Sequence, residues 1–382
     1  MQTNELTAEA LRRLAELRAA DGCVLSIYLN LDPSQFATGQ ARSTAIRSLV
    51  DEADRRIRNG KDLSHDERRA LREDLERVRA FFRGDGFDAK GAHALAVFAC
   101  GPAGLFEAIK LPRPVESTVV IDRAPYVEPL ADLASGDGRW CVLLVNRRNA
   151  RILRGGPHGL EEVQDISDVV LSRHDQGGWS QARFQRGVDK EAQDHYKHTG
   201  ETLMRRFKRR PFDFLVVGAT EAVWTDMERE LHPYLRQRMV GRVDVDVENT
   251  TPEQVRQAVA PLIGEREQRR ERELIDRVLE GRGAAGRGVA GLDEVLGALN
   301  ERRVEVLLIQ DGLTGPGVVC PRDGWLGSGG KRCPVDGTPL EARDDVLEPA
   351  VRAAIAQSAD ICVVRHDQRI GELDGVAAVL RF

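Results

Sequence analysis

The chain has 382 residues, of which 41% are hydrophobic, 31% are charged and 5% are aromatic, and its formal net charge is −5 at pH 7. This length exceeds what one hydrophobic core usually organises, the few aromatic residues disfavour a surface that stacks on single-stranded bases, and the net acidity restricts nucleic-acid contacts to local basic patches. Six scattered cysteines, no signal-peptide pattern after Met1 and no apolar run of about 18 residues predict a cytoplasmic protein that does not enter a membrane.

Residues 1–134 are predicted to form the first domain. A helical pattern around Leu14 precedes a strand at 23–30, and two further helices follow. The second of these begins with Ser64 and Glu67, whose spacing is that of a capping box, in which each side chain accepts a hydrogen bond from a free N–H at the helix start. The apolar runs 94–100 and 117–121 predict two more strands, so we expect an α/β domain.

Residues 135–263 are predicted to form a middle α/β domain with a mixed sheet. The apolar run 140–146, the turn after it and the returning run 150–153 are typical of a hairpin. A Gly-Gly loop follows, then a helix over about 180–209 and a strand at Val216 and Val217, with helix and strand alternating to residue 263. This alternation indicates a compact domain from which the loop projects.

The Gly-Gly pair is the most informative motif of the chain. Two consecutive residues without Cβ atoms allow the backbone to approach a ligand that a larger residue would block. The pattern and the long helix after it resemble the Gly-Gly-Gln loop of the archaeal and eukaryotic class-I release factors, a superfamily with bacterial, Pelota-like, Balon-like and mitochondrial peptidyl-tRNA hydrolase branches. The matching positions are Gly177, Gly178, Ser180, Arg183, Phe184 and Arg186.

The chain departs from this pattern at the position directly after Gly-Gly, where Trp179 replaces the family's catalytic glutamine. The nearest glutamine is Gln181. The resemblance implies that Gly177 and Gly178 enter the ribosomal peptidyl-transferase centre and that Gln181 orients the water that attacks the peptidyl-tRNA ester, a form of catalysis by positioning. Trp179 and the adjacent Ser180 are expected to contact RNA, Trp179 by stacking on a base or plugging the entry; the alternative is that Trp179 anchors the loop on its own domain.

The long helix after the loop supplies positive charge. At about 100° per residue its cations gather on one side, opposite an apolar face, and five of six residues at its end are basic. Contacts to an RNA backbone are therefore expected; the alternative is a solvated charged face, because acidic residues share the helix. The expected RNA-binding cations are Arg183, Arg186, Lys190, Lys197, Arg205, Arg206, Lys208, Arg209 and Arg210.

Residues 264–288 are predicted to be a charged helix that ends in a glycine-rich hinge, which is typical of an interdomain connector. Residues 289–382 read as helix, strand, insertion, helix and two strands. That order is similar to the C-terminal domain of the release factors and Pelota, whose α/β fold is shared with kink-turn-binding ribosomal proteins. The sequence thus predicts an α/β protein of three domains, with an insertion at 318–340 in the last one.

This insertion contains a repeated knuckle, Cys320-Pro-Arg-Asp323 and Cys333-Pro-Val-Asp336. It resembles the paired Cys-x-x-Cys knuckles of a zinc ribbon, a form found in this domain of related proteins, with Asp in place of each second Cys. Two thiolates and two carboxylates can complete a tetrahedral zinc site. The alternative is a metal-free relic, because the Pro and Asp-Gly pairs form tight turns without an ion. No cofactor is expected to be required.

The resemblance implies a translation factor that binds the ribosomal A site through ribosomal RNA and tRNA. Its expected activity is the hydrolysis of peptidyl-tRNA on stalled ribosomes. The alternative is a non-catalytic rescue or hibernation factor that occupies the peptidyl-transferase centre, and a third alternative is an RNA-binding protein without a ribosomal role. A translational GTPase is a candidate partner, whereas DNA and membranes are not expected partners.

Overall fold

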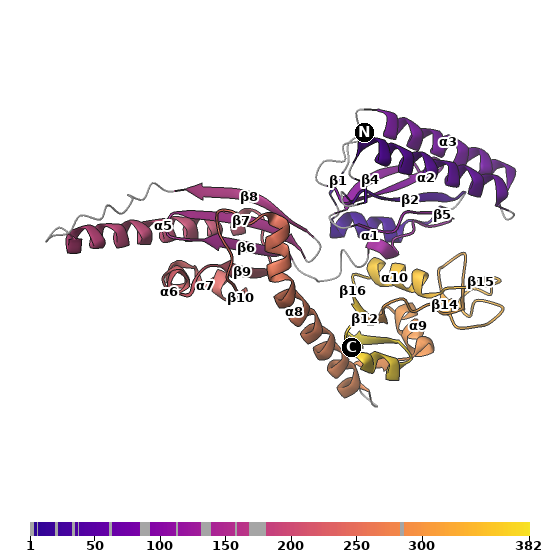
Figure 1. Ribbon diagram of the computed structural model, residues 1–382. Helices are drawn as coiled ribbons and strands as arrows, with labels where there is room; N and C mark the ends of the chain where they lie inside the picture. The colour runs from indigo at the N-terminus through magenta and orange to yellow at the C-terminus, as the bar shows by residue number, and fades with distance from the viewer. Residues whose placement is uncertain are drawn as a thin grey trace. The chain divides into compact units, whose positions relative to one another are not determined.

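The computed structural model describes residues 4–5, 7–19, 22–32, 35–36, 38–60, 63–84, 92–111, 114–130, 139–156, 159–167, 181–282 and 286–382. It contains two compact units. The first combines Met1–Gly136 with Gln268–Phe382, and the second is Asp137–Glu267. Both units contain helices and sheets, so the expected α/β class is confirmed (Figure 1). None of the described helices is long and apolar enough to cross a bilayer.

The N-terminal part of the first unit is a five-stranded sheet in the order β1-β4-β3-β2-β5. Its strands are β1 (Asn4–Glu5), β2 (Val24–Asn30), β3 (Ala94–Cys100), β4 (Leu105–Leu111) and β5 (Thr118–Asp122), and its helices are α1 (Ala8–Glu16), α2 (Gly39–Asn59) and α3 (His65–Arg83). The pair β1–β4 is parallel and the other pairs are antiparallel. Side chains alternate along β2, so that Leu25 and Ile27 pack with α2 and α3 while Tyr28 enters the core on the other face.

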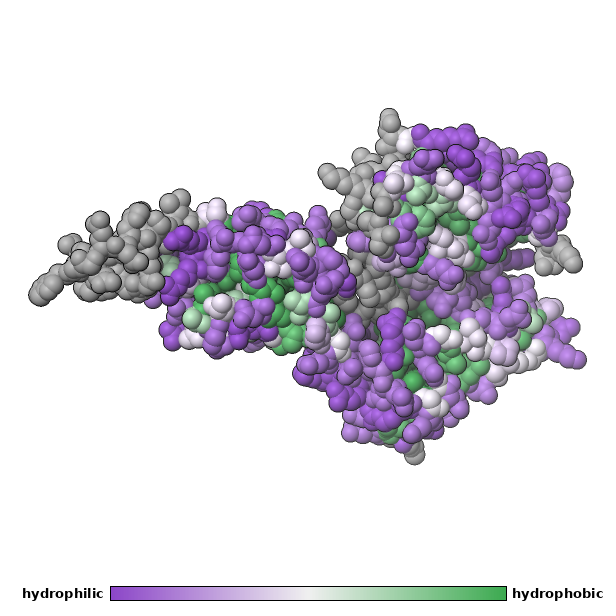
Figure 2. Space-filling view, in the orientation of Figure 1, coloured by the Kyte–Doolittle hydropathy of each residue, from purple (hydrophilic) through white to green (hydrophobic). Residues whose placement is uncertain are grey.

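The predicted capping box of α3 is confirmed. The Ser64 Oγ atom accepts a hydrogen bond from the Glu67 N–H at 3.2 Å, and the Glu67 carboxylate accepts one from the Ser64 N–H at 2.7 Å. The outer surface of α2 and α3 is largely hydrophilic, with some apolar residues among the polar ones (Figure 2), in keeping with the charged residues on the solvent side of these amphipathic helices.

The C-terminal part of the first unit is a four-stranded sheet in the order β11-β17-β12-β16. Its elements are β11 (Gly288–Ala290), α9 (Leu292–Asn300), β12 (Val304–Gln310), α10 (Leu347–Ala356), β16 (Asp360–Val364), the 3₁₀ helix η1 (Gln368–Leu373) and β17 (Val376–Leu380). The predicted insertion between β12 and α10 forms a small sheet of its own, with the strands β13 (Gly317–Val319), β14 (Leu326–Gly327) and β15 (Glu341–Arg343) in the order β14-β13-β15.

The second unit has a mixed five-stranded sheet in the order β10-β9-β6-β7-β8. Its elements are β6 (Trp140–Val145), β7 (Asn149–Gly156), β8 (Gly159–Ser167), α5 (Gln181–Arg209), β9 (Phe214–Gly218), α6 (Glu221–Glu230), α7 (Pro233–Arg236) and β10 (Met239–Val243). The predicted hairpin is β6–β7, and β8 extends it by a strand that the sequence patterns did not predict. One face of the sheet packs against α5, α6 and α7.

The expected connector helix begins earlier than predicted. Helix α8 runs without a break over Pro252–Gly281 and contains Pro261, so the expected boundary at residues 263–264 falls inside it. Val255 and Val259 belong to the core of the second unit, whereas Ile275 and Val278 belong to a core of the first. The helix therefore contributes apolar residues to both units.

Candidate functional site

The Gly-Gly loop falls in residues 168–180, outside the described residues. The predictions for Gly177, Gly178, Trp179 and Ser180 therefore lie outside them too. Gln181 is the first residue of α5. Its side chain, like those of Arg183 and Arg186, also lies outside the described part, so the assigned roles of these three residues stay predictions.

The described part of α5 has the two faces that its sequence predicts. Ala192, Tyr196 and Leu203 are buried against the sheet and Phe207 packs at the edge of the same core. The lysines Lys190, Lys197 and Lys208 are exposed. An apolar stripe therefore packs the helix against the sheet, and the opposite side presents cations.

The charge along this exposed side is not uniform. Asp194 and Glu201 are exposed at helical spacings of four residues from Lys190 and Lys197, so the middle of the helix carries balanced charge. From residue 205 onward there is no acid up to Asp213, and the five cations are Arg205, Arg206, Lys208, Arg209 and Arg210. Net positive charge is therefore concentrated at the C-terminal end of α5.

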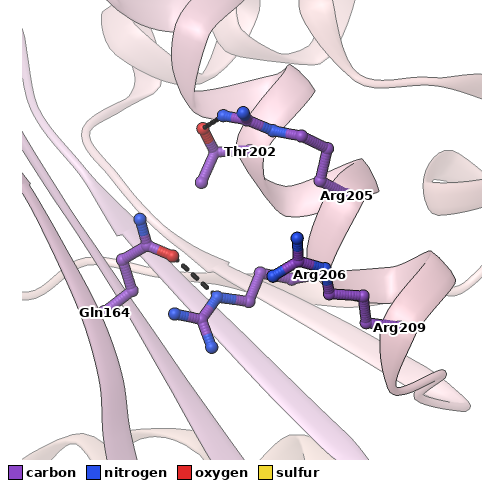
Figure 3. Close-up of a pocket in the computed structure, with 5 residues that line it drawn as sticks. All are labelled: Gln164, Thr202, Arg205, Arg206 and Arg209. Atoms are coloured by element: carbon purple, nitrogen blue, oxygen red, sulfur yellow. Dashed lines mark hydrogen bonds between the residues drawn. The ribbon is translucent and has the colours of Figure 1, made fainter.

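A pocket of about 240 Å³ lies at this end, between α5 and β8. Gln164 of β8 lines it together with Thr202, Arg205, Arg206 and Arg209 of α5 (Figure 3). The Arg206 guanidinium donates to the Gln164 side chain at 2.7 Å and to the Val163 carbonyl at 3.1 Å. The Arg205 guanidinium donates to the buried Thr202 hydroxyl at 2.7 Å. Neutral acceptors thus hold two of the three arginines in place.

More positive charge lies near the C-terminal end of α5. Arg154 of β7 donates hydrogen bonds to the carbonyls of Arg210 and Pro211, which follow α5. Burial lowers the pKa of Arg154, and the neighbouring charges of Arg210, Arg139 and Arg206 lower it further. A cation whose proton is disfavoured by its neighbours marks a region of positive potential.

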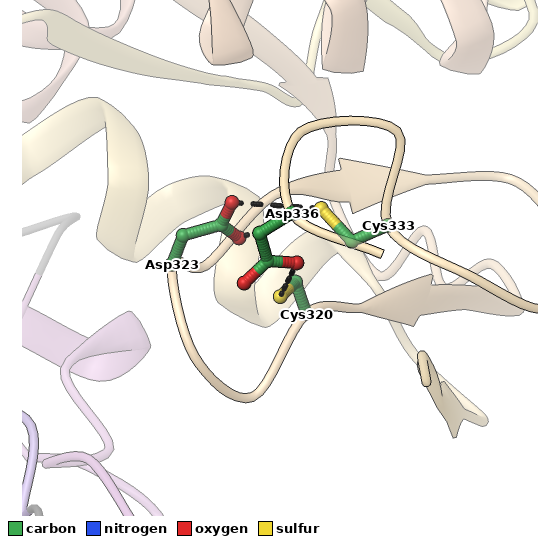
Figure 4. Close-up of side chains that lie close together, drawn as sticks. All are labelled: Cys320, Asp323, Cys333 and Asp336. Atoms are coloured by element: carbon green, nitrogen blue, oxygen red, sulfur yellow. Dashed lines mark hydrogen bonds between the residues drawn. The ribbon is translucent and has the colours of Figure 1, made fainter. Parts of the chain in front are cut away.

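The second constellation is the pair of knuckles in the insertion. Side-chain ligand atoms of Cys320, Asp323, Cys333 and Asp336 all lie within 4.8 Å of one another (Figure 4). The pairs cross between the knuckles, with Cys333 Sγ at 3.5 Å from Asp323 Oδ2 and Cys320 Sγ at 4.0 Å from Asp336 Oδ1. Four ligand atoms around a tetrahedral zinc ion lie about 3.3–3.8 Å apart, so small inward movements would complete such a site.

The two knuckles have the same backbone. The N–H of Gly324 donates to the Cys320 carbonyl and that of Gly337 to the Cys333 carbonyl. Both glycines have positive φ, 80° and 74°, in the region where glycine is favoured. Such repeated turns direct the Cys and Asp side chains of each knuckle toward one point.

Hydrogen bonds also favour the ionised form of the two carboxylates. Burial opposes ionisation of Asp323, but hydrogen bonds from the Cys320 thiol, the Trp325 N–H and the Cys333 thiol lower its pKa. The N–H and hydroxyl of Thr338 lower the pKa of Asp336, and burial raises the pKa of the Cys333 thiol. Two ionised carboxylates facing two thiols are a donor set that fits a divalent metal ion.

The middle of the chain is similar to a known protein family. Residues 125–263 match the family model of bacterial archaeo-eukaryotic release factor family 10. The peptide chain release factor subunit 1 of Thermoplasma acidophilum is 26% identical over 302 residues, which are 72% of this chain and 71% of the relative. The chain is release factor-like. The corresponding protein of Methanopyrus kandleri is 29% identical over 229 residues, or 57% of this chain and 55% of the relative.

Solved structures of related factors also align with the release factor-like chain. An archaeal translation termination factor covers 99% of it at 18% identity with a TM-score of 0.27. A structure of ribosome-bound archaeal Pelota and ABCE1 covers 100% at 16% identity with a TM-score of 0.42. At such TM-scores the likeness does not establish a common arrangement of the whole chain, so the assignment rests on sequence.

The structure brings some predicted site residues of the release factor-like protein together and separates others. The four knuckle residues form one cluster, and Arg205, Arg206 and Arg209 share one pocket. Two pocket residues were not predicted. Gln164 lies on the unexpected strand β8, and Thr202 could have been found because it precedes Arg205 by three residues on the same helix.

Proposed function

We propose that this protein binds the ribosomal A site and directs its Gly-Gly loop into the peptidyl-transferase centre, where it hydrolyses peptidyl-tRNA. The observation that carries the proposal is the family match at 125–263, the part of the chain that contains both the loop and α5. The relatives at 26% and 29% identity are peptide chain release factors, which supports a role in translation. Ribosomal RNA and tRNA are the proposed partners, and the resemblance adds a translational GTPase.

In this proposal the chain catalyses hydrolysis by positioning the loop and the attacking water. Gly177 and Gly178 allow close approach of the backbone, and Gln181, at the start of α5, orients the attacking water. The experiment measures release of labelled peptide from purified ribosome·peptidyl-tRNA complexes by wild type, Gly178→Ala and Gln181→Ala. Gln193→Ala, which alters an exposed glutamine of the same helix, is the matched control.

Release that is lost in Gly178→Ala and Gln181→Ala but kept in Gln193→Ala is the expected result. Release that Gln181→Ala leaves unchanged would contradict the role of this residue. Co-sedimentation with ribosomes is measured on the same samples to separate binding from chemistry.

A non-catalytic factor is the second candidate function, and Trp179 is the observation that favours it. A large aromatic residue stands where the family has its catalytic glutamine, and a Trp side chain can fill the entry of the peptidyl-transferase centre. This function predicts co-sedimentation with ribosomes without peptide release, and inhibition of peptidyl transfer that Trp179→Ala relieves.

We also propose that Cys320, Asp323, Cys333 and Asp336 hold a structural zinc ion. The proposal is supported by the distances among their ligand atoms and by the matching turns of the two knuckles. A bound zinc ion would cross-link the two turns. Metal analysis of the purified protein is expected to give one zinc per chain, lost in Cys333→Ser and kept in Cys362→Ser, which alters a buried thiol outside the cluster. Wild-type protein without bound metal would refute the proposal.

A further inference from the structure

The pocket between β8 and α5 has the composition of an anion site. Among the described residues, three guanidinium groups, one amide and one hydroxyl line it, and no carboxylate does. No described carboxylate forms an ion pair with Arg205, Arg206 or Arg209. Since its volume of about 240 Å³ lies below the roughly 300–1,000 Å³ of sites for whole small molecules, the pocket suits a single charged group.

The arginines keep most of their donors available. A guanidinium has five N–H donors in a planar fork. Arg206 uses its Nε and one terminal nitrogen for Gln164 and Val163, and Arg205 uses one terminal nitrogen for Thr202. The remaining donors, with those of Arg209, are available to a group that accepts several hydrogen bonds. A phosphate, with its several charged oxygens, is such a group.

Stabilisation of the helix end does not account for this arrangement. Cations are favoured at a helix C-terminus, but that effect does not require their heads to be fixed. Here Arg206 and Arg205 are fixed by an amide, a carbonyl and a buried hydroxyl, all of which leave the positive charge unneutralised. Several positive charges at one site, none of them in an ion pair with a described carboxylate, favour an anionic ligand.

The position of the pocket indicates a polymeric ligand. Lys208 and Arg210 flank Arg209 in the chain, and Arg154 of β7 donates hydrogen bonds to the carbonyls of Arg210 and Pro211, so further cations lie near this end of α5. The exposed lysines farther along α5 alternate with Asp194 and Glu201, which weakens their attraction for a polyanion. The contact is therefore concentrated at the pocket rather than spread along the helix.

We propose that this pocket binds a backbone phosphate of RNA, with Arg205 and Arg209 as its principal ligands and with Arg206 and Thr202 as positioning residues. The proposal rests on the proposed function only in that the ribosome supplies the RNA. Base identity is not read, because the pocket offers donors suited to phosphate oxygens.

The test uses the full-length protein and a short, fluorescein-labelled single-stranded RNA, with binding followed by fluorescence anisotropy over a series of KCl concentrations. The Arg205→Gln/Arg209→Gln variant is compared with Lys190→Gln/Lys197→Gln, which removes the same charge from the same helix. We expect about tenfold weaker binding for the arginine variant, and a salt slope smaller by about 0.7 for each phosphate that this variant no longer neutralises. The lysine variant is expected to lose less than about threefold in affinity.

Equal weakening by the two variants would overturn the proposal, because affinity would then follow net charge alone. Failure of the wild type to bind the RNA at low salt would overturn it as well. Thermal unfolding of each variant excludes a folding defect, and Arg205→Lys/Arg209→Lys, which keeps the charge but not the fork, is expected to recover only part of the affinity.

Competition with inorganic phosphate distinguishes the two sources of phosphate. Displacement of the RNA only at high phosphate concentration supports a backbone site, and displacement at low concentration would instead show a site for free phosphate. Ribosome co-sedimentation of the wild type is measured separately. If the wild type does not co-sediment with ribosomes but the arginine variant still binds RNA more weakly than the lysine variant, the proposed function is refuted and the pocket is not. If the wild type co-sediments and the two variants bind RNA with equal affinity, the pocket is refuted and the proposed function is not.

Discussion

Glu271 of α8 is a buried carboxylate that holds a turn of the first unit. It is 4% exposed and accepts hydrogen bonds from the N–H groups of Arg365, His366 and Asp367 at 2.8–3.0 Å. The loop that carries these N–H groups follows β16. We expect Glu271→Ala to lower the free energy of unfolding by about 3 kcal/mol, because three backbone N–H donors lose their buried, charged acceptor.

The matched control is Glu273→Ala, which removes an exposed carboxylate from the same helix. Its expected effect is within about 0.5 kcal/mol. Urea denaturation followed by circular dichroism measures both variants, and similar losses in the two would show that the hydrogen bonds of Glu271 do not stabilise the unit.

Glu348 in the first turn of α10 gives the first unit a pH dependence. Burial raises its pKa from 4.5 to about 7; Arg352 and Arg343 oppose the shift, and Asp122 and Glu128 add to it. The folded state therefore holds a proton that the unfolded state releases between these values. The unfolding free energy is expected to fall as pH rises through this window, by up to about 3 kcal/mol, and to be level above it.

The Glu348→Gln side chain imitates the protonated carboxyl group, so the variant should not lose unfolding free energy as pH rises through this window. We expect the variant to exceed the wild type in stability at about pH 8 and to match it at about pH 4.5. Glu372→Gln, at an exposed position of the same unit, is the control. A stability difference that does not change with pH would contradict the assignment of the titrating group.

At the scale of elements, local patterns predicted most of the fold. The apolar stripe of α5, the capping box at Ser64 and the buried runs of β3 and β6 each depend on neighbouring residues, and the structure confirms them. The clustering of Cys320 with Cys333 was also foreseeable, because the repeated motif predicts two equal turns.

Two features of the fold, strand β8 and the continuation of helix α8 through a proline, could not be predicted from local sequence because they depend on tertiary contacts. Strand β8 alternates weakly in sequence and its pairing with β7 is irregular between Ile152 and Leu153, so Gln164 was not placed beside α5. Helix α8 continues through Pro261, a residue that ordinarily ends a helix. Packing of Val259 and Ile263 on the sheet on either side of the proline stabilises the continuation.

The crossing of α5 and α6 requires glycine. A Cβ atom on Gly200 would lie 2.5 Å from the carbonyl oxygen of Glu230, the last residue of α6. Gly297 of α9 has no such neighbour within 4 Å. We expect Gly200→Ala to destabilise the second unit by about 1–3 kcal/mol through overpacking, and Gly297→Ala to stabilise the first by about 0.5–1 kcal/mol through helix propensity. Thermal unfolding compares the two, and a stabilising Gly200→Ala would show that the helices separate without cost.

At the scale of the molecule, the two constellations belong to different units. The pocket of Arg205 and Arg209 lies in the second unit, and the cluster of Cys320 and Cys333 lies in the first. Each unit has its own hydrophobic cores. The stability of one constellation and the RNA affinity of the other are therefore separable quantities.

Removal of metal tests this separation. If the knuckles bind zinc, a chelator is expected to lower the melting temperature of one transition by about 10 °C, since a ligand at a thousandfold excess over its Kd stabilises by about 4 kcal/mol. RNA affinity is expected to change by less than about twofold, because none of the described residues that line the pocket is Cys, His, Asp or Glu. The Arg205→Gln/Arg209→Gln variant should show the converse, with weaker RNA binding and an unchanged response to chelator. A chelator that weakens RNA binding as strongly as it lowers the melting temperature would show that the two units are energetically coupled, since neither constellation shares a residue with the other.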